Sequence, residues 1–134
     1  MKSDLENSRF SFEYARSNYT EKTALENGFK LLKATDLYEK IINKTVHGNY
    51  PMGFRFISKI FENGKTVGIN DVGSKDIGTW RFDFDNNTFH LQWKNGWQNT
   101  ITRAYEVNGN IEFYDIDTGN WRTTFVRAIN FQIE

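Results

Sequence analysis

The sequence predicts a mainly β protein of the α+β class. We expect an antiparallel up-and-down meander of seven to eight strands that forms a closed or nearly closed barrel behind one or two short N-terminal helices. Aromatic residues make up 16% of the 134 residues, and the chain has 10 Gly but a single Pro. Aromatic strands joined by Gly and Asn turns have this composition. Apolar and polar residues also alternate with the period of two that strands require.

Two short helices are expected before residue 45. Thr20 is suited to cap a helix over residues 21–27. Asp36 is followed by Glu39 in an arrangement that resembles a capping box, ahead of an apolar i, i+4 stripe. A second helix is therefore expected around residues 36–43, packed across one end of the barrel.

The turns are the clearest sign of hairpins. Asn-Gly occurs at Asn63-Gly64, Asn95-Gly96 and Asn108-Gly109, and this pair favours the type I′ turn between two strands. Asp85-Asn86-Asn87 and residues 117–120 supply two more turns. The expected strands are Gly53–Phe61, Lys65–Asn70, Ile77–Phe84, Thr88–Lys94, Trp97–Val107, Ile111–Ile116 and Trp121–Ile129.

Each expected strand has one apolar and one polar face, as in an antiparallel sheet that covers a single core. The apolar faces carry Trp80, Phe82, Phe84, Phe89, Leu91, Trp93, Ile101, Tyr105, Val107, Ile111, Phe113, Trp121, Phe125 and Ile129. The polar faces carry Arg81, Asp83, Thr88, His90, Gln92, Thr102 and Glu106.

The chain is expected to form one helix-plus-barrel domain over residues 20–134, preceded by a flexible arm at residues 1–19. With 17 basic and 17 acidic residues the formal net charge is zero, which argues against nucleic-acid binding through bulk charge. No apolar stretch is long enough for a membrane span, and there is no cysteine to act as a thiolate. As written the chain is expected to be cytoplasmic; the alternative is export with its signal peptide removed.

Two resemblances concern the barrel. Gly78-Thr79-Trp80 is similar to the G-x-W of lipocalins, in which an Arg from the last strand packs over the Trp, here Arg127 over Trp80. Residues 45–115, with Phe61-x-Asn63-Gly64, Gly78-x-Trp80 and Leu91-Gln92-Trp93 among their motifs, resemble a family of small, uncharacterised, mostly exported bacterial proteins with a lipocalin-like barrel. The resemblance implies the fold, and it implies no activity.

No catalytic residue, metal ligand or cofactor is predicted. His47 and His90 are the only histidines, too few to suggest zinc without carboxylates. Residues 83–87 and 115–119 resemble the start of a calcium loop, but Asp and Asn are also the preferred residues of hairpin turns. An enzyme would require His90 in a cleft beside a carboxylate, and we regard an enzyme as the third hypothesis.

The first functional hypothesis is non-enzymatic binding of a small apolar or amphipathic molecule inside the barrel. Arg103 and Arg127 alternate with apolar neighbours, so each is either a charged anchor inside the pocket or an arginine that is exposed at the rim or paired with a carboxylate. The predicted ligand-binding residues are Trp80, Phe82, Trp93, Arg103, Tyr105, Phe113 and Arg127. The alternative is a protein-interaction or inhibitory domain, monomer or homodimer, with a filled core and an exposed Trp97 or Trp121.

Overall fold

The computed structural model describes residues 16, 18–51 and 54–131. Its strands are β1 Lys30–Leu32, β2 Lys44–Tyr50, β3 Phe54–Ile60, β4 Lys65–Asn70, β5 Lys75–Asp83, β6 Thr88–Trp93, β7 Thr100–Val107, β8 Asn110–Asp115 and β9 Trp121–Asn130. The helices are α2 Glu21–Glu26 and α3 Ala34–Ile41.

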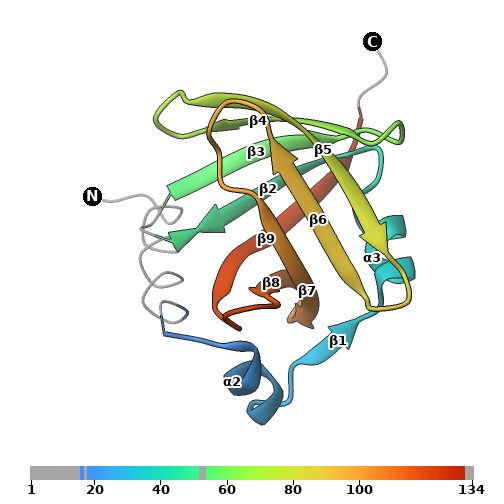
Figure 1. Cartoon of the computed structure of the whole chain (residues 1–134), viewed down its shortest axis with the longest axis vertical. Coiled ribbons are helices and arrows are strands. Elements are labelled where there is room, and N and C mark those ends of the chain that lie inside the picture. Colours follow the sequence, from blue (N-terminus) through green and yellow to red (C-terminus); the bar gives the residue numbers. More distant parts are fainter. Residues whose placement is uncertain (1–15, 17, 52–53, 132–134) are drawn as a thin grey trace.

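The eight strands β2 to β9 form a closed antiparallel barrel (Figure 1). Each strand pairs with the next one along the chain, and β9 returns to pair with β2. The predicted fold class, a mainly β closed meander with short N-terminal helices, is confirmed. Because the meander is antiparallel, the ends of β2, β4, β6 and β8 lie at the same end of the barrel as the starts of β3, β5, β7 and β9.

The barrel wall opens between β6 and β7, and β1 fills the gap. Only the first part of β7 pairs with β6, through residues 100–102. Residues 104–106 of β7 pair instead with β1. β1 and β2 are not among the strands expected from the sequence. β1 has only three residues, which is too short for apolar and polar residues to show a period-two pattern.

One of the three Asn-Gly pairs forms the predicted type I′ turn. Asn108 and Gly109 have φ angles of 51° and 85°, which lie in the left-handed region that this turn requires at both central positions. At the other two pairs only Gly64 and Gly96 have a positive φ. The type I′ prediction is therefore wrong for those two, which belong to longer connections.

The helices begin close to where the sequence places them. Thr20 caps α2 as predicted, with its side chain accepting a hydrogen bond from the backbone of Thr23. α3 begins at Ala34, before the predicted start at residue 36, and the side-chain oxygen of Asn87 accepts from the Ala34 N–H at 3.0 Å. The turn between β5 and β6 therefore holds the start of α3, in place of the predicted capping box.

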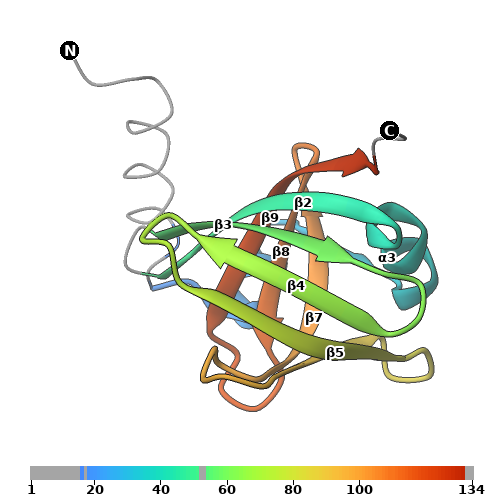
Figure 2. The same cartoon turned by 90° about the horizontal axis from the view of Figure 1, so that it is seen from above.

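α3 closes one end of the barrel, as predicted (Figure 2). Leu37 and Ile41, one helical turn apart, are buried at 2% and 0% exposure and belong to the main core. Tyr38 packs edge-on against Trp80 and Phe82 of β5. This end of the barrel is filled by side chains.

The predicted faces are correct for β5 and β6, wrong for β7 and wrong for Trp121 of β9, which does not share the core face of Phe125. Cross-strand partners share a face, and Thr102 and Ala104 pair with the core residues Phe89 and Phe113. Thr102 and Ala104 therefore face inward, although the sequence predicts Thr102 outside. The apolar residues of β7 were misassigned because its outer side is also covered, so alternation does not distinguish the two sides.

The segment before β1 covers the outer side of β7, β8 and β9. Ala24 of α2 joins Tyr105, Tyr114 and Trp121 in a second buried cluster. Arg16 lies on the same side, where its Nε donates to both carboxylate oxygens of Glu112 at 2.9 Å. Most of the arm predicted at residues 1–19 lies outside the described residues.

Candidate functional site

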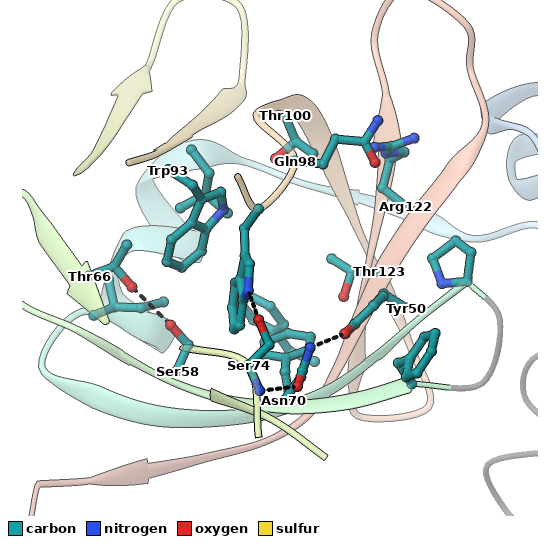
Figure 3. A pocket seen from close by; sticks show the side chains of 17 residues that line it. Tyr50, Ser58, Thr66, Asn70, Ser74, Trp93, Gln98, Thr100, Arg122 and Thr123 are labelled. Atoms are coloured by element: carbon teal, nitrogen blue, oxygen red, sulfur yellow. Dashed lines mark hydrogen bonds between the residues drawn. The ribbon is translucent and has the colours of Figure 1, made fainter. Parts of the chain in front are cut away.

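A cavity of about 450 Å³ opens into the barrel at the end opposite α3 (Figure 3). It is lined by Tyr50, Pro51, Phe54, Phe56, Ser58, Ile60, Thr66, Asn70, Ser74, Leu91, Trp93, Trp97, Gln98, Thr100, Arg122, Thr123 and Phe125. Most of these residues come from the ends of β2, β4 and β6, from the starts of β3, β7 and β9, and from the connections beside them, whereas a few lie deeper along β3, β4 and β6. Its size falls within the range of small-molecule sites.

The cavity reaches deep into the barrel. Its lining includes Ile60, at the end of β3, and Thr66, near the start of β4. The Ile60 carbonyl accepts from the N–H of Asn43, just beyond α3, so these residues lie near the closed end. At a rise of about 3.3 Å per residue, β3 alone spans roughly 20 Å.

The polar groups at the bottom of the cavity are satisfied. The hydroxyl oxygens of Ser58 and Thr66 lie 2.9 Å apart, and each also lies 2.9 Å from a backbone carbonyl, that of Val67 for Ser58 and that of Lys59 for Thr66, so each single hydroxyl proton has an acceptor. Both residues are buried, at 5% and 1% exposure. A ligand at this depth would meet an apolar surface with no unsatisfied side-chain polar group, which favours a hydrocarbon over a polar molecule.

Two tryptophans form one wall of the cavity. The rings of Trp93 and Trp97 lie 4.8 Å apart, and the indole N–H of Trp97 donates to the Ser74 hydroxyl at 3.0 Å. Gly68 of β4 makes this packing feasible, since a Cβ atom there would lie 2.6 Å from the Trp97 ring. The absence of a side chain at one position on β4 therefore admits an aromatic wall from the β6–β7 loop.

Asp76 holds the loop that carries Trp97. Its carboxylate accepts from the backbone N–H groups of Asn95 and Trp97 at 2.9 Å, and from that of Ile77 at 2.7 Å. Burial raises the pKa of Asp76, but these N–H groups outweigh that effect and lower the pKa below its ordinary value. The carboxylate therefore remains ionised and fixes the loop at neutral pH.

Tyr50 and Asn70 lie near the mouth, where the amide of Asn70 donates to the Tyr50 hydroxyl oxygen at 3.1 Å. Burial raises the pKa of Tyr50, so its hydroxyl remains protonated at neutral pH. Its proton is available to a ligand acceptor. Figure 3 shows Arg122 and Gln98 on the other side of the pocket from Ser58 and Thr66.

Four of the seven predicted site residues face the barrel interior. Trp93 lines the cavity, whereas Trp80, Phe82 and Phe113 belong to or pack against the core around it. Their contact with a ligand stays a prediction. Gly78, of the Gly78-Thr79-Trp80 motif, allows β5 to lie close to β6. A Cβ atom at this position would lie 2.5 Å from the carbonyl oxygen of Gln92.

Of the two alternatives for Arg103 and Arg127, the rim-exposed or paired arginine holds, and neither residue points into the barrel. Arg103 donates to Glu21 of α2 at 2.6 Å, and the Tyr105 hydroxyl donates to the same carboxylate at 2.8 Å, so both lie on the outer side of β7. Arg127 is exposed and pairs across strands with His47. It does not pack over Trp80, whose indole N–H donates to the Phe61 carbonyl.

Trp97 and Trp121, which the protein-interaction hypothesis expects at an exposed surface, lie in less accessible positions. Trp121 is 4% exposed in the outer cluster, and Trp97 is half-buried in the cavity wall. They form no exposed aromatic patch among the described residues.

His90 lies in a second pocket with Arg81, Asp115 and Asp117, and this pocket shares Leu91 and Thr100 with the lining of the cavity. Its ring shares a hydrogen bond with the Thr88 hydroxyl at 2.9 Å, and none of the ion pairs within the described part of the chain involves it. Burial, and then the charge of Arg81, lower the pKa of His90.

The Asp-rich segments act as turns. Asp83 accepts from the backbone of Asp85 and Asn86, and Asp115 accepts from the backbone of Asp117. Across residues 16, 18–51 and 54–131, no group of three or more His, Cys, Asp or Glu is placed to hold a metal ion. In the same ranges, no helix is long and apolar enough to cross a membrane.

Among the lining residues that sequence analysis missed are Tyr50, Asn70 and Arg122. Asn70 closes a predicted strand, and a turn-forming Asn gives no signal of facing a cavity. Arg122 lies on a predicted strand, but its direction depends on an irregularity of β9 that alternation does not predict.

Comparisons with protein-family models, with curated proteins and with solved structures give no match. The barrel that the lipocalin-like resemblance implies is present, and membership of that family is not supported.

Proposed function

We propose that the protein binds a small apolar or amphipathic molecule in the cavity at the open end of the barrel. The observation that supports this proposal most is the contrast inside one barrel: one end is filled by α3, whereas the other leaves about 450 Å³ unfilled. Protein interiors are normally close-packed, so an unfilled volume of this size favours an occupant.

The shape and chemistry of the lining support an elongated, mainly hydrocarbon ligand. Aromatic rings from Tyr50, Phe54, Phe56, Trp93 and Trp97 surround the cavity. The polar side chains Asn70, Gln98, Thr100 and Arg122 come from strand ends or from the loop at the open end. An apolar interior with polar groups at one end is typical of sites for amphipathic molecules.

The test is titration with N-phenyl-1-naphthylamine, a neutral dye that fluoresces in apolar sites. We expect saturable binding of the dye, and displacement by straight-chain alcohols. Each buried methylene contributes about 0.8 kcal/mol, so two more carbons should tighten binding about tenfold until the cavity is full. Absence of saturable binding by the folded protein would contradict the proposal.

A matched pair of variants locates the dye. Thr100→Trp adds a ring on the cavity side of β7 and is expected to weaken dye binding about tenfold or more, because it removes apolar area from the site. Val67→Trp adds the same ring to β4 at an exposed position and is expected to leave the affinity unchanged. Equal effects of the two variants would place the dye elsewhere.

Protein interaction is a second candidate, favoured by one surface. The outer side of β3, β4 and β5 exposes paired aliphatic side chains, Ile57 beside Ile69 and Val67 beside Ile77. If this surface mediates self-association, sedimentation velocity should show a dimer that Ile69→Lys converts to a monomer. A monomer at all concentrations would exclude the homodimer.

A further inference from the structure

We propose that the ligand of this cavity carries an anionic head group, and that Arg122 binds it at the open end. This inference rests on the function proposed above, because it names the chemical class of the molecule held in the same site.

A β-bulge in β9 directs Arg122 into the cavity. Trp121 pairs with Tyr114 and Thr123 pairs with the adjacent residue Phe113, so Arg122 is an extra residue without a partner on β8. Thr123 faces the cavity, and in a regular strand its neighbour would face outward. Instead Trp121 lies in the outer cluster and Arg122 lines the cavity. Bulges often re-aim side chains in this way beside functional sites.

Arg122 is the only half-buried arginine without a carboxylate in the described part of the chain. Each of the other three has a carboxylate oxygen within 4.0 Å: Arg16 from Glu112, Arg55 from Asp71, and Arg103 from Glu21. Arg81 and Arg127 also lack such a partner, but both are exposed to water. Arg122 is thus partly withdrawn from water without an anion to compensate its charge.

The lining around Arg122 is neutral. Among the described residues that line the cavity, Arg122 is the only charged one, and none is acidic. Gln98 adds a neutral amide donor beside it, and Tyr50 offers a hydroxyl donor, whereas the Thr123 hydroxyl donates to the Asn49 carbonyl at 2.7 Å. A planar guanidinium binds a carboxylate or a phosphate through two parallel hydrogen bonds. The hydrocarbon part of such a ligand would extend toward Ile60, at the bottom of the cavity.

The experiment displaces N-phenyl-1-naphthylamine with decanol, decanoate, decyl phosphate and decyltrimethylammonium. These compounds share the alkyl chain and differ in the head group. A hydrogen-bonded charge pair should make decanoate or decyl phosphate bind about 10- to 100-fold more tightly than decanol, and the ammonium compound more weakly than decanol. The ratio of decanoate to decyl phosphate affinity distinguishes a carboxylate from a phosphate ligand.

Arg122→Gln should remove the preference for the anion, so that decanoate binds no more tightly than decanol. Arg127→Gln is the matched control, since it removes the same charge from an exposed position on the same strand. We expect it to keep the full preference. Loss of the preference in both variants would indicate bulk charge and overturn the inference.

A pH series on the unaltered protein tests the inference without a variant. The advantage of decanoate over decanol should shrink as the pH falls from 7 to about 4, where carboxylic acids become protonated, while decanol binding stays constant over that range. Equal affinity for decanoate and decanol at pH 7 would overturn the inference and leave the proposed function intact. Failure of both dye and decanol to bind would instead overturn the proposed function.

Discussion

The two ends of the barrel are built from the same strands and differ in how they are filled. At the closed end, α3 inserts Leu37 and Ile41 into the core, and Tyr38 packs on the rings of β5. At the open end the β6–β7 loop covers one wall, and the interior between the strands stays unfilled. The same inward alternation therefore yields a packed core at one end and a cavity at the other.

The comparison separates stability from binding within one fold. Side chains at the closed end are buried on all sides, so their contacts contribute to the free energy of unfolding. Side chains at the open end each have one side without protein neighbours and lose those contacts. We therefore expect substitutions at the closed end to cost stability and substitutions at the open end to cost mainly affinity.

The largest expected effect is at the closed end. Ile41 is 0% exposed, and Ile41→Ala should lower the free energy of unfolding by about 2–5 kcal/mol through loss of packing and creation of a cavity. Phe54→Ala at the mouth removes a larger but half-buried side chain, and should cost only about 1–2 kcal/mol. Urea unfolding of both variants measures the difference. An equal cost at the two sites would remove the distinction between the ends.

Two glycines sharpen the comparison. A methyl group at Gly78 would meet the backbone of Gln92 at 2.5 Å, which is difficult to move, and Gly78→Ala should cost about 1–3 kcal/mol. A methyl group at Gly68 meets only the end of the Trp97 ring, which can shift into the cavity. Gly68→Ala should therefore cost less stability, change the tryptophan fluorescence and weaken dye binding. The reverse order of stability would show that the wall at Trp97 is rigid.

The smallest expected effect is a local loosening in acid. The folded-state pKa of Asp76 lies below its ordinary value, so its stabilising effect is complete above about pH 4, the ordinary range of Asp. That effect is lost as the pH falls through the lowered pKa. Hydrogen exchange at the amides of Asn95 and Trp97, corrected for intrinsic rates, should lose protection there before the amide of Ile41 does. In the variant Asp76→Asn, the amides of Asn95 and Trp97 should lose the same protection at pH 7. The substitution replaces one accepting carboxylate oxygen with an NH₂ group, which cannot accept a hydrogen bond from the loop.

The elements with a strong local signal were predicted well from the sequence. β4 has the predicted bounds, Lys65–Asn70, and Thr20 caps α2 as expected. The inward alternation of β5 and β6 placed Trp80 and Trp93 correctly, because the outer sides of those strands are polar. Where one face of a strand is exposed to water, period-two alternation is sufficient to assign it.

The rest of the candidate site depends on contacts distant in the sequence. Tyr105 looks like a core residue of β7 and is indeed buried, but against α2 on the outer side. Arg103 has its carboxylate partner on the same helix. The direction of Arg122 follows from a bulge that local propensity does not indicate. Contacts with distant segments therefore determine which of these side chains face the cavity, and a single sequence does not show such contacts.

The return of β9 to β2 has a consequence for how this chain folds. Closure joins Thr45 to Ile129, and Leu31 joins Tyr105, so the pairings that complete the wall link segments far apart in the sequence. Such non-local pairing slows folding. During synthesis the hairpins from β2 to β8 emerge before the strand that covers the free edge of β2, and in that interval the edge is available to other chains. The nascent meander is therefore the stage at which this protein is most prone to aggregate.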